Sequence, residues 1–164
     1  MNKQELQNEI NKTKEHLANM EKMLAECEYE RWKPKTDEIY WYIAIDGSVE
    51  QQINVNHWVD KCHFKTLNCF QTREQAEAEA EKILVRRQLE DIAKRLNKGV
   101  EINWKNEYQF KYGIYLRTTK DEIDWTRTIN TKIQGVIYCL DLNFYNVAIQ
   151  EIGEERLKKY LRGE

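Results

Sequence analysis

Two histidines and two cysteines lie within thirteen residues of each other in the first half of the chain: His57, Cys62, His63 and Cys69. Zinc accepts imidazole nitrogen and thiolate sulfur, so these residue types suit a four-ligand site. Their spacing, His-x4-Cys-His-x5-Cys, does not favour one, because zinc sites commonly carry a Cys-x2–4-Cys or a His-x3–5-His pair. On a strand, the adjacent residues Cys62 and His63 would point to opposite faces. We therefore predict ordinary sheet residues here, with no metal and no cofactor.

A covalent reaction at a cysteine is the other chemistry that these residue types offer. Cys62 or Cys139 would be the nucleophile and His57 its general base. An isolated cysteine within an aromatic, apolar pattern is more typical of a small core residue than of a nucleophile. The sequence also contains neither a glycine-rich phosphate loop nor a His-Glu-x-x-His motif. We predict that the protein is not an enzyme, and an enzyme based on the Cys and His residues is the least favoured alternative.

The composition sets the class of protein that these residues belong to. The chain has 164 residues, enough for one domain or for a small domain with an appendage. Its formal net charge of −2 provides no overall attraction to nucleic acid or to an anionic membrane. No apolar run approaches the ~20 residues that cross a bilayer, and the polar N-terminal residues do not resemble a secretory signal. We expect reduced cysteines, a cytoplasmic location and no membrane contact.

Residues 1–30 predict a charged helix with a narrow apolar seam. The seam residues follow a 4-3 spacing: Leu6, Ile10, Thr13, Leu17, Met20, Leu24 and Cys27. Such a seam favours another helix as its neighbour rather than a broad globular surface. In a parallel dimer, Glu9 would face Lys14 of the other copy, and a charged His16 would face Glu21. We predict a homo-oligomer formed through Leu6, Ile10, Leu17, Met20 and Leu24. Packing on the helix expected at 73–96 and docking on a foreign helix are the alternatives.

The segment 31–99 predicts three antiparallel strands and a long helix. The first strand, at 39–45, is expected to bury one face: Ile39, Trp41, Ile43 and Ile45. A turn at Asp46 and Gly47 leads into a second strand at 49–55. A third short strand is expected at 64–70.

Thr72 and Gln75 then form a capping box, which starts a helix that reaches about residue 96. The segment 100–164 repeats this pattern at an offset of 69 residues, and its first strand is expected to bury a corresponding face: Tyr108, Phe110, Tyr112 and Ile114. It ends in a helix from about residue 141 that is interrupted at Gly153. We predict an α+β fold, with the N-terminal heptad helix followed by two antiparallel β-β-β-α units. An internal duplication would explain the repeat, although two unrelated antiparallel segments can share the same pattern.

The outer faces of the two expected first strands are the candidate binding face. They carry aromatic and basic side chains: Tyr40, Tyr42, Gln109, Lys111, Tyr115 and Arg117. Aromatic groups interleaved with basic groups on a sheet stack bases and contact phosphates in nucleic-acid-binding proteins. The alternative is an ordinary solvent face or a face covered by a helix.

Four segments carry a resemblance to known proteins: 30–34 (ERWKP), 68–77 (NCFQTREQAE), 135–138 (GVIY) and 148–160 (AIQEIGEERLKKY). Together with the N-terminal heptad helix and the aromatic strand that ends in Asp46 and Gly47, the chain resembles small proteins encoded by phages and prophages of Gram-positive bacteria. The resemblance covers nearly the whole chain. Its motifs are caps, turns and core positions, and they imply no catalytic residues. Relatives often carry glycine before the Asn-x-Phe segment, where this chain has Leu67.

This resemblance implies a function only through its context. Small accessory phage proteins often bind and block a host antiviral system. We therefore expect a non-catalytic inhibitor in the host cytoplasm that binds a defence component, in the manner of an anti-CRISPR protein. The alternatives are a protein that sequesters a nucleotide signal and a regulator that binds nucleic acid.

Overall fold

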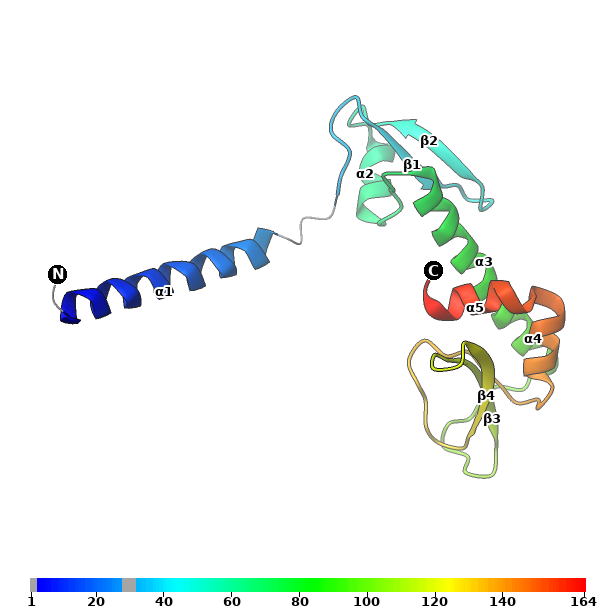
Figure 1. Ribbon diagram of the computed structural model, residues 1–164. Helices are drawn as coiled ribbons and strands as arrows, with labels where there is room; N and C mark the ends of the chain where they lie inside the picture. Colours follow the sequence, from blue (N-terminus) through cyan, green and yellow to red (C-terminus); the bar gives the residue numbers. More distant parts are fainter. Residues whose placement is uncertain (1–2, 28–31) are drawn as a thin grey trace. The chain divides into compact units, whose positions relative to one another are not determined.

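The computed structural model describes residues 3–27 and 32–164, and side chains of the N-terminal helix at residue 4 and at 6–20. The chain is a mixed α+β protein with two small antiparallel sheets among the described residues, which confirms the predicted class. It separates into two compact units, residues 1–35 and 36–164. The first unit contains helix α1 (Lys3–Cys27), and the second contains all the other elements (Figure 1).

The second unit begins with a hairpin of β1 (Ile39–Ile43) and β2 (Val49–Ile53). The two strands pair antiparallel, with Trp41 opposite Gln51. The predicted turn is present, and Gly47 takes a positive φ of 89° that suits glycine. Helix α2 (Trp58–Lys65) follows β2.

The third strand expected at 64–70 does not form, so that prediction is wrong: α2 continues to Lys65, and residues 66–67 form a turn. Only Phe70 pairs with β1, through two backbone hydrogen bonds of 2.9 and 2.8 Å with Trp41. The side-chain amide of Asn68 extends this pairing, because it accepts from the N–H of Ile43 at 2.9 Å and donates to its C=O at 2.8 Å. Residues 68–70 therefore cover the edge of β1 that faces away from β2.

Helix α3 (Arg73–Leu96) starts where the capping box predicts. Thr72 Oγ accepts from the N–H of Gln75 at 3.3 Å, and Gln75 Oε1 accepts from the N–H of Thr72 at 3.4 Å. The helix contacts β1 and β2 near its start, and α4, α5 and β5 further along. It therefore contacts elements on both sides of the boundary expected at residue 99.

The second sheet consists of β3 (Lys111–Arg117), β4 (Glu122–Thr128) and β5 (Tyr138–Cys139), in the order β4-β3-β5. Gly113 lies in β3 directly under the segment before β5, since a Cβ at this position would lie 2.8 Å from Val136 Cγ1. The first strand is central in both halves, because β1 lies between β2 and Phe70. Helix α2 has no counterpart between β4 and β5, and the duplication is not confirmed.

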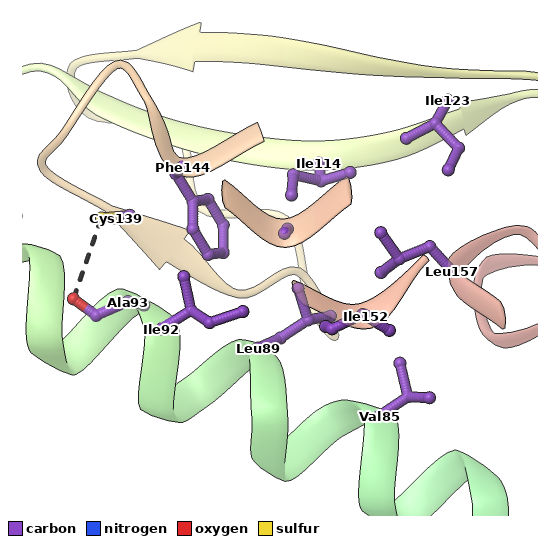
Figure 2. Close-up of a cluster of buried hydrophobic side chains, with 11 residues drawn as sticks. Val85, Leu89, Ile92, Ala93, Ile114, Ile123, Cys139, Phe144, Ile152 and Leu157 are labelled. Carbon is purple, nitrogen blue, oxygen red and sulfur yellow. Dashed lines mark hydrogen bonds between the residues drawn. The ribbon is translucent and has the colours of Figure 1, made fainter. Parts of the chain in front are cut away.

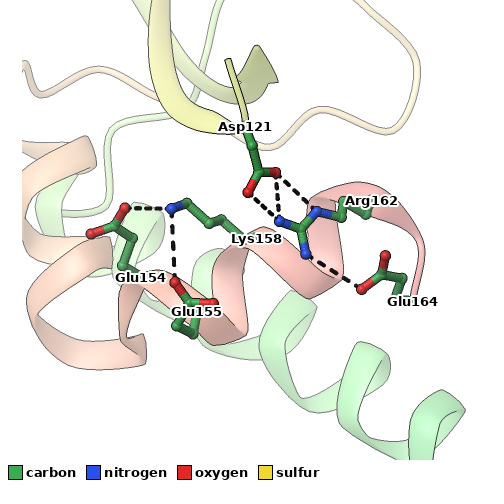
Figure 3. Close-up of polar contacts among 6 residues, drawn as sticks. All are labelled: Asp121, Glu154, Glu155, Lys158, Arg162 and Glu164. Carbon is green, nitrogen blue, oxygen red and sulfur yellow. Dashed lines mark hydrogen bonds and ion pairs between the residues drawn. The ribbon is translucent and has the colours of Figure 1, made fainter. Parts of the chain in front are cut away.

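The chain ends in α4 (Phe144–Ile152) and α5 (Glu154–Arg162), and the break at Gly153 agrees with the sequence. Figure 3 shows that α5 is tied to the turn between β3 and β4, where Asp121 receives hydrogen bonds from the Arg162 guanidinium at 2.5 and 3.0 Å. These hydrogen bonds lower the pKa of Asp121. On the same helix, Lys158 pairs with Glu154 at 2.8 Å.

One apolar cluster lies between α3, the second sheet and the two C-terminal helices (Figure 2). It contains Val85, Leu89, Ile92, Ala93, Ile114, Ile123, Cys139, Phe144, Ala148, Ile152 and Leu157. We call this part of the second unit the core end. The part formed by β1, β2, α2 and the first turns of α3 is the hairpin end.

The predicted buried faces of the two first strands are wrong in several positions. Ile39 and Ile45 are exposed, and Trp41 and Ile43 are half-buried. Tyr108 and Phe110 are exposed and precede β3, whereas Ile114 is buried as expected. Among the described residues, no helix is both long enough and apolar enough to cross a membrane.

Candidate functional site

The interior of the hairpin end is polar. The Tyr40 hydroxyl donates to Asp60 Oδ1 at 2.8 Å and lies 2.9 Å from His63 Nδ1. Asp60 Oδ2 accepts from the backbone N–H groups of His57 at 2.8 Å and Val55 at 3.2 Å. Tyr40 and Asp60 are fully buried, so these hydrogen bonds fasten α2 to the hairpin from inside.

The number of available protons fixes the tautomer of His63. Tyr40 has one hydroxyl proton, which it donates to Asp60, so we assign a proton to His63 Nδ1 that is donated to the Tyr40 oxygen. Burial raises the pKa of Tyr40, and the hydrogen bond and charge of Asp60 raise it further. The ring of His63 also stacks on Tyr42, with ring centroids 4.3 Å apart. His63 is therefore held in place by two tyrosines.

The four His and Cys residues considered for zinc do not gather at one point. His57 precedes α2, and Cys62 is exposed on that helix. Cys69 is buried near Phe70, and His63 points to Tyr40. No group of three His, Cys, Asp or Glu side chains that could hold a metal ion occurs within residues 3–27 and 32–164. Because α2 is a helix, the expected placement of Cys62 and His63 on a strand is wrong.

The outside of the hairpin end carries large apolar side chains. Six large apolar residues around it are exposed: Ile39, Ile45, Ile53, Val55, Trp58 and Leu67. Trp58 has 66% of its surface exposed and Leu67 has 61%. Leu67 also has a φ of 65°, a left-handed conformation that is costly for a residue with a branched side chain. This conformation ends α2, because the N–H of Leu67 donates to the C=O of Phe64 at 3.3 Å and the N–H of Asn68 donates to the C=O of His63 at 2.8 Å.

A hollow of about 880 Å³ lies between the turn of the hairpin and the side of α3. Its walls include apolar groups from three segments, among them Ile43, Ile45, Leu67 and Leu84. Charged groups border it, with Arg73 paired to Glu77 at 2.7 Å and placed 5.8 Å from the ring of Trp41. The hollow therefore combines apolar walls with a charged rim, which is typical of a surface that binds another molecule.

The candidate binding face chosen from the sequence is only partly exposed. Tyr40 is buried, and Tyr42 is half-buried with its hydroxyl donating to Glu50 Oε2 at 2.5 Å. Lys111 is also buried, and its ammonium group donates to the backbone C=O groups of Asn106 at 3.0 Å and Ile129 at 2.5 Å. The expected exposure of Tyr40 and Lys111 is wrong, because both serve as internal hydrogen-bond donors.

The remaining members of that face lie near the surface of the second sheet. Gln109 is half-buried, and its side-chain oxygen accepts from the N–H of Asn103 at 2.8 Å. Tyr115 is exposed, and both Tyr115 and Arg117 bond to the carboxylate of Asp124. These groups satisfy one another, so this part of the face offers few free donors.

The sequence analysis missed a second aromatic surface around β4 and the segment before β3. Tyr108, Phe110 and Trp125 are exposed there, and the Arg127 guanidinium carbon lies 4.7 Å from the Phe110 ring centroid. Tyr108 and Phe110 were expected to be buried, because their alternation with polar residues resembles a strand. The strand begins three residues after Tyr108, which leaves both rings outside the core.

The predicted oligomer seam lies on α1. Leu6, Ile10, Leu17 and Met20 are exposed along one side of the helix. The Thr13 hydroxyl donates to the C=O of Glu9 at 2.8 Å, so this polar residue of the seam is satisfied within the helix. The side chains of Leu24, Cys27 and Glu21 lie outside the described residues.

No family model matches the chain, and neither does any curated protein or solved structure. The resemblance to phage proteins thus stays an expectation from the quoted segments.

Proposed function

We propose that this protein is a non-catalytic binding protein that contacts a macromolecular partner through the hairpin end. The observation that carries the proposal is the apolar exterior of that end, where Ile45, Trp58 and Leu67 lie exposed around a polar interior. Scattered exposed apolar residues are common on proteins, but a concentration of them is typical of interaction sites. Leu67 adds to this, because the end of α2 leaves its large apolar side chain exposed.

In this proposal, the polar groups inside the hairpin end have a structural role rather than a catalytic one. Tyr40, Asp60 and His63 bond to one another, and Tyr40 and Asp60 are sealed from solvent. A general acid or base needs contact with a reacting group, which these buried atoms lack. The proposal therefore excludes catalysis by this cluster.

The partner that fits the resemblance is a protein of a bacterial antiviral system, such as a CRISPR effector nuclease. In this form, the protein is a phage or prophage accessory protein that occupies a functional surface of the effector in the host cytoplasm. The proposal for the partner rests on the resemblance, whereas the proposal for the binding surface rests on the exposed apolar residues.

Affinity purification from a host that carries the defence system tests both parts. The tagged chain should retain a defence protein and suppress the defence in a plaque assay. The double variant Trp58→Ser/Leu67→Ser should lose both effects and remain folded. The matched control is Val100→Ser, which changes an exposed apolar residue elsewhere in the second unit. Equal retention by all three proteins would contradict the proposed surface.

We also propose that α1 joins two copies of the chain in a parallel coiled coil. The exposed strip of Leu6, Ile10, Leu17 and Met20 supports it, together with the complementary positions of Glu9 and Lys14. Each such charge pair contributes less than ~1 kcal/mol on a surface, so apolar burial must supply most of the stability. In light scattering, Leu17→Asp should reduce the mass of the particle. The control Asn11→Asp places the same charge away from the seam and should leave the mass unchanged.

Binding of nucleic acid or of a nucleotide signal is the second candidate function. The observation that favours it is the exposed group of Tyr108, Phe110 and Trp125 with Arg127 beside Phe110. A purified nucleotide complex would absorb near 260 nm. Affinity for single-stranded RNA or DNA should fall steeply as the salt concentration rises, and Phe110→Ala should weaken it. Binding that does not change with salt or with Phe110→Ala would rule out this second function.

A further inference from the structure

The two edges of the hairpin sheet differ in how their backbone groups are used. Trp41 directs its N–H and C=O to Phe70, so its neighbours Tyr40 and Tyr42 direct theirs to β2. The same alternation along β2 directs the backbone groups of Glu50 and Gln52 to β1. Val49, Gln51 and Ile53 therefore point their N–H and C=O groups away from β1.

This outer edge of β2 is short and unprotected. Within the described parts of the chain, β2 pairs with no strand other than β1, whereas Asn68 and Phe70 cover the opposite edge. The edge ends at Val55, whose N–H is already donated to Asp60. β2 contains no lysine or proline, which are the residues that usually prevent pairing at an edge. Its one charge, Glu50, accepts a hydrogen bond from Tyr42.

We propose that β2 pairs antiparallel with β2 of a second copy of this chain, around a two-fold axis at Gln51. Gln51 would face Gln51 of the other copy, and Val49 would face Ile53. All the free backbone groups of Val49, Gln51 and Ile53 would then be bonded across the axis. A continuous sheet of four strands would result, in the order β1-β2-β2-β1.

The side chains of this register are complementary to themselves. Ile39 is the cross-strand partner of Ile53, and Ile43 is the partner of Val49. Pairing of the two copies extends these into a row of four apolar residues on each side of the axis, and the two Gln51 amides lie between the rows. Ile39 and Ile53, now exposed beside a hollow of about 390 Å³, would be covered by Val49 of the other copy.

The neighbouring registers are less favourable. An axis at Glu50 would place two carboxylates directly opposite each other, which is destabilising. An axis at Gln52 would require the N–H of Val55, which Asp60 already accepts. Only the axis at Gln51 uses the whole edge without opposing like charges.

This interface is separate from the coiled coil proposed for α1 and from the surface around Trp58 and Leu67. The full chain with Leu17→Asp isolates it, because that change targets α1 alone. Sedimentation velocity of this protein should show a dimer that forms with rising concentration. NMR should show slower amide exchange at Val49, Gln51 and Ile53 in the dimer, and unchanged exchange at Glu50.

Two further changes in the Leu17→Asp chain test the register. Gln51→Pro removes an outward N–H without touching the bonds to β1, and it should give a monomer that retains the amide spectrum of a folded protein. Gln51→Lys places two ammonium groups at the axis, and it should weaken the dimer at least tenfold at low salt and less at high salt. The control Gln71→Lys, at an exposed position outside β2, should leave the dimer intact.

A monomeric Leu17→Asp chain at every concentration would overturn the proposal. It would also be overturned if Gln51→Pro and Gln51→Lys dimerised like the parent. Amide protection that appears only when an extended peptide is added would assign the edge to another partner and would equally overturn pairing of two copies.

Discussion

The hairpin end and the core end of the second unit are stabilised by different forces. At the core end, apolar side chains from α3, α4, α5 and the second sheet fill the interior (Figure 2). At the hairpin end, the buried groups include Tyr40, Asp60 and Asn54, while Ile39, Ile53 and Trp58 are exposed. The core end therefore has an apolar interior, whereas the hairpin end has polar groups in its interior and apolar residues on its exterior.

From this difference we infer that the core end provides most of the stability and that the hairpin end provides the surface for recognition. Apolar burial at the core end stabilises the unit without needing exact directions, since the hydrophobic effect is non-directional. Hydrogen bonds at the hairpin end contribute less net free energy but fix geometry, because they depend on angle and distance. The hairpin end can therefore keep its shape while its apolar residues remain available to a partner.

The largest expected effect comes from the core end. Phe144→Ala removes a fully buried ring and should lower the free energy of unfolding by about 3–5 kcal/mol. Urea denaturation followed by circular dichroism measures it. The control is Leu142→Ala, an exposed residue two positions earlier, which should change stability by less than about 0.5 kcal/mol. Similar losses in both variants would contradict an apolar core at Phe144.

The stability of the hairpin end should depend on a buried carboxylate, whereas that of the core end depends on a buried aromatic ring. Asp60→Ala leaves the N–H groups of Val55 and His57 without their acceptor, which should cost about 2–3 kcal/mol. Amide exchange should accelerate at Val55 and His57 and stay slow in the second half of α3. Asp91→Ala, on the exposed side of α3, is the control and should change stability much less. Amide exchange that accelerates equally at both ends would contradict a local role of Asp60 at the hairpin end.

Acid should weaken the hairpin end. Burial lowers the pKa of His63, although the charge of Asp60 opposes this. Burial raises the pKa of Asp60, but hydrogen bonds from Tyr40 and from the N–H groups of His57 and Val55 outweigh it and lower the pKa overall. For both groups the unfolded chain binds protons more readily, so stability falls as the pH drops below about 6.5 and again below about 3.9.

Urea denaturation at a series of pH values between 7.5 and 3.5 measures this dependence. His63→Phe keeps a ring against Tyr42 and should remove the loss that begins near the pKa of an unfolded histidine. His57→Phe, at an exposed position, serves as the control and should keep that loss. A parent protein whose stability is constant from pH 7.5 to 5 would contradict a neutral His63 with a lowered pKa.

The smallest expected change has the opposite sign. Leu67→Gly relieves a left-handed conformation that costs a non-glycine residue roughly 1–2 kcal/mol, and greater freedom of the unfolded chain offsets about half of this. The variant should be more stable by about 0.5–1 kcal/mol and should bind the partner less well. Leu142→Gly, at an exposed position without a positive φ, should instead destabilise the protein. Thermal unfolding distinguishes the two signs.

Local signals in the sequence predicted several elements correctly. The capping box at Thr72 and Gln75 marks the start of α3, the Asp46-Gly47 pair marks the hairpin turn, and Gly153 marks the break between α4 and α5. Each of these depends on residues close together in the chain. The mixed α+β class followed from them.

The predictions from the sequence were wrong where residues far apart in the chain determine the structure. Strand β1 carries large apolar side chains on both faces, so its alternation does not reveal that Tyr40 points inward. That choice depends on Asp60 and His63 of α2, a helix that the sequence analysis did not predict. One sequence signal for the start of α2 was available: Asp60 lies three residues after His57, and its carboxylate accepts from the N–H of His57. This signal is weak, because histidine is not among the preferred N-cap residues.

The continuous helix α3, which runs from the hairpin end to the core end in Figure 1, has a consequence during synthesis. Ribosomes complete α3 before the residues that cover Val85, Leu89 and Ile92 are made. The covering segment extends to Leu157, about sixty residues later, which takes roughly 3–12 s at translation rates of about 5–20 residues per second. During those seconds the nascent chain presents an apolar helical stripe, and molecular chaperones have a defined interval in which to shield it.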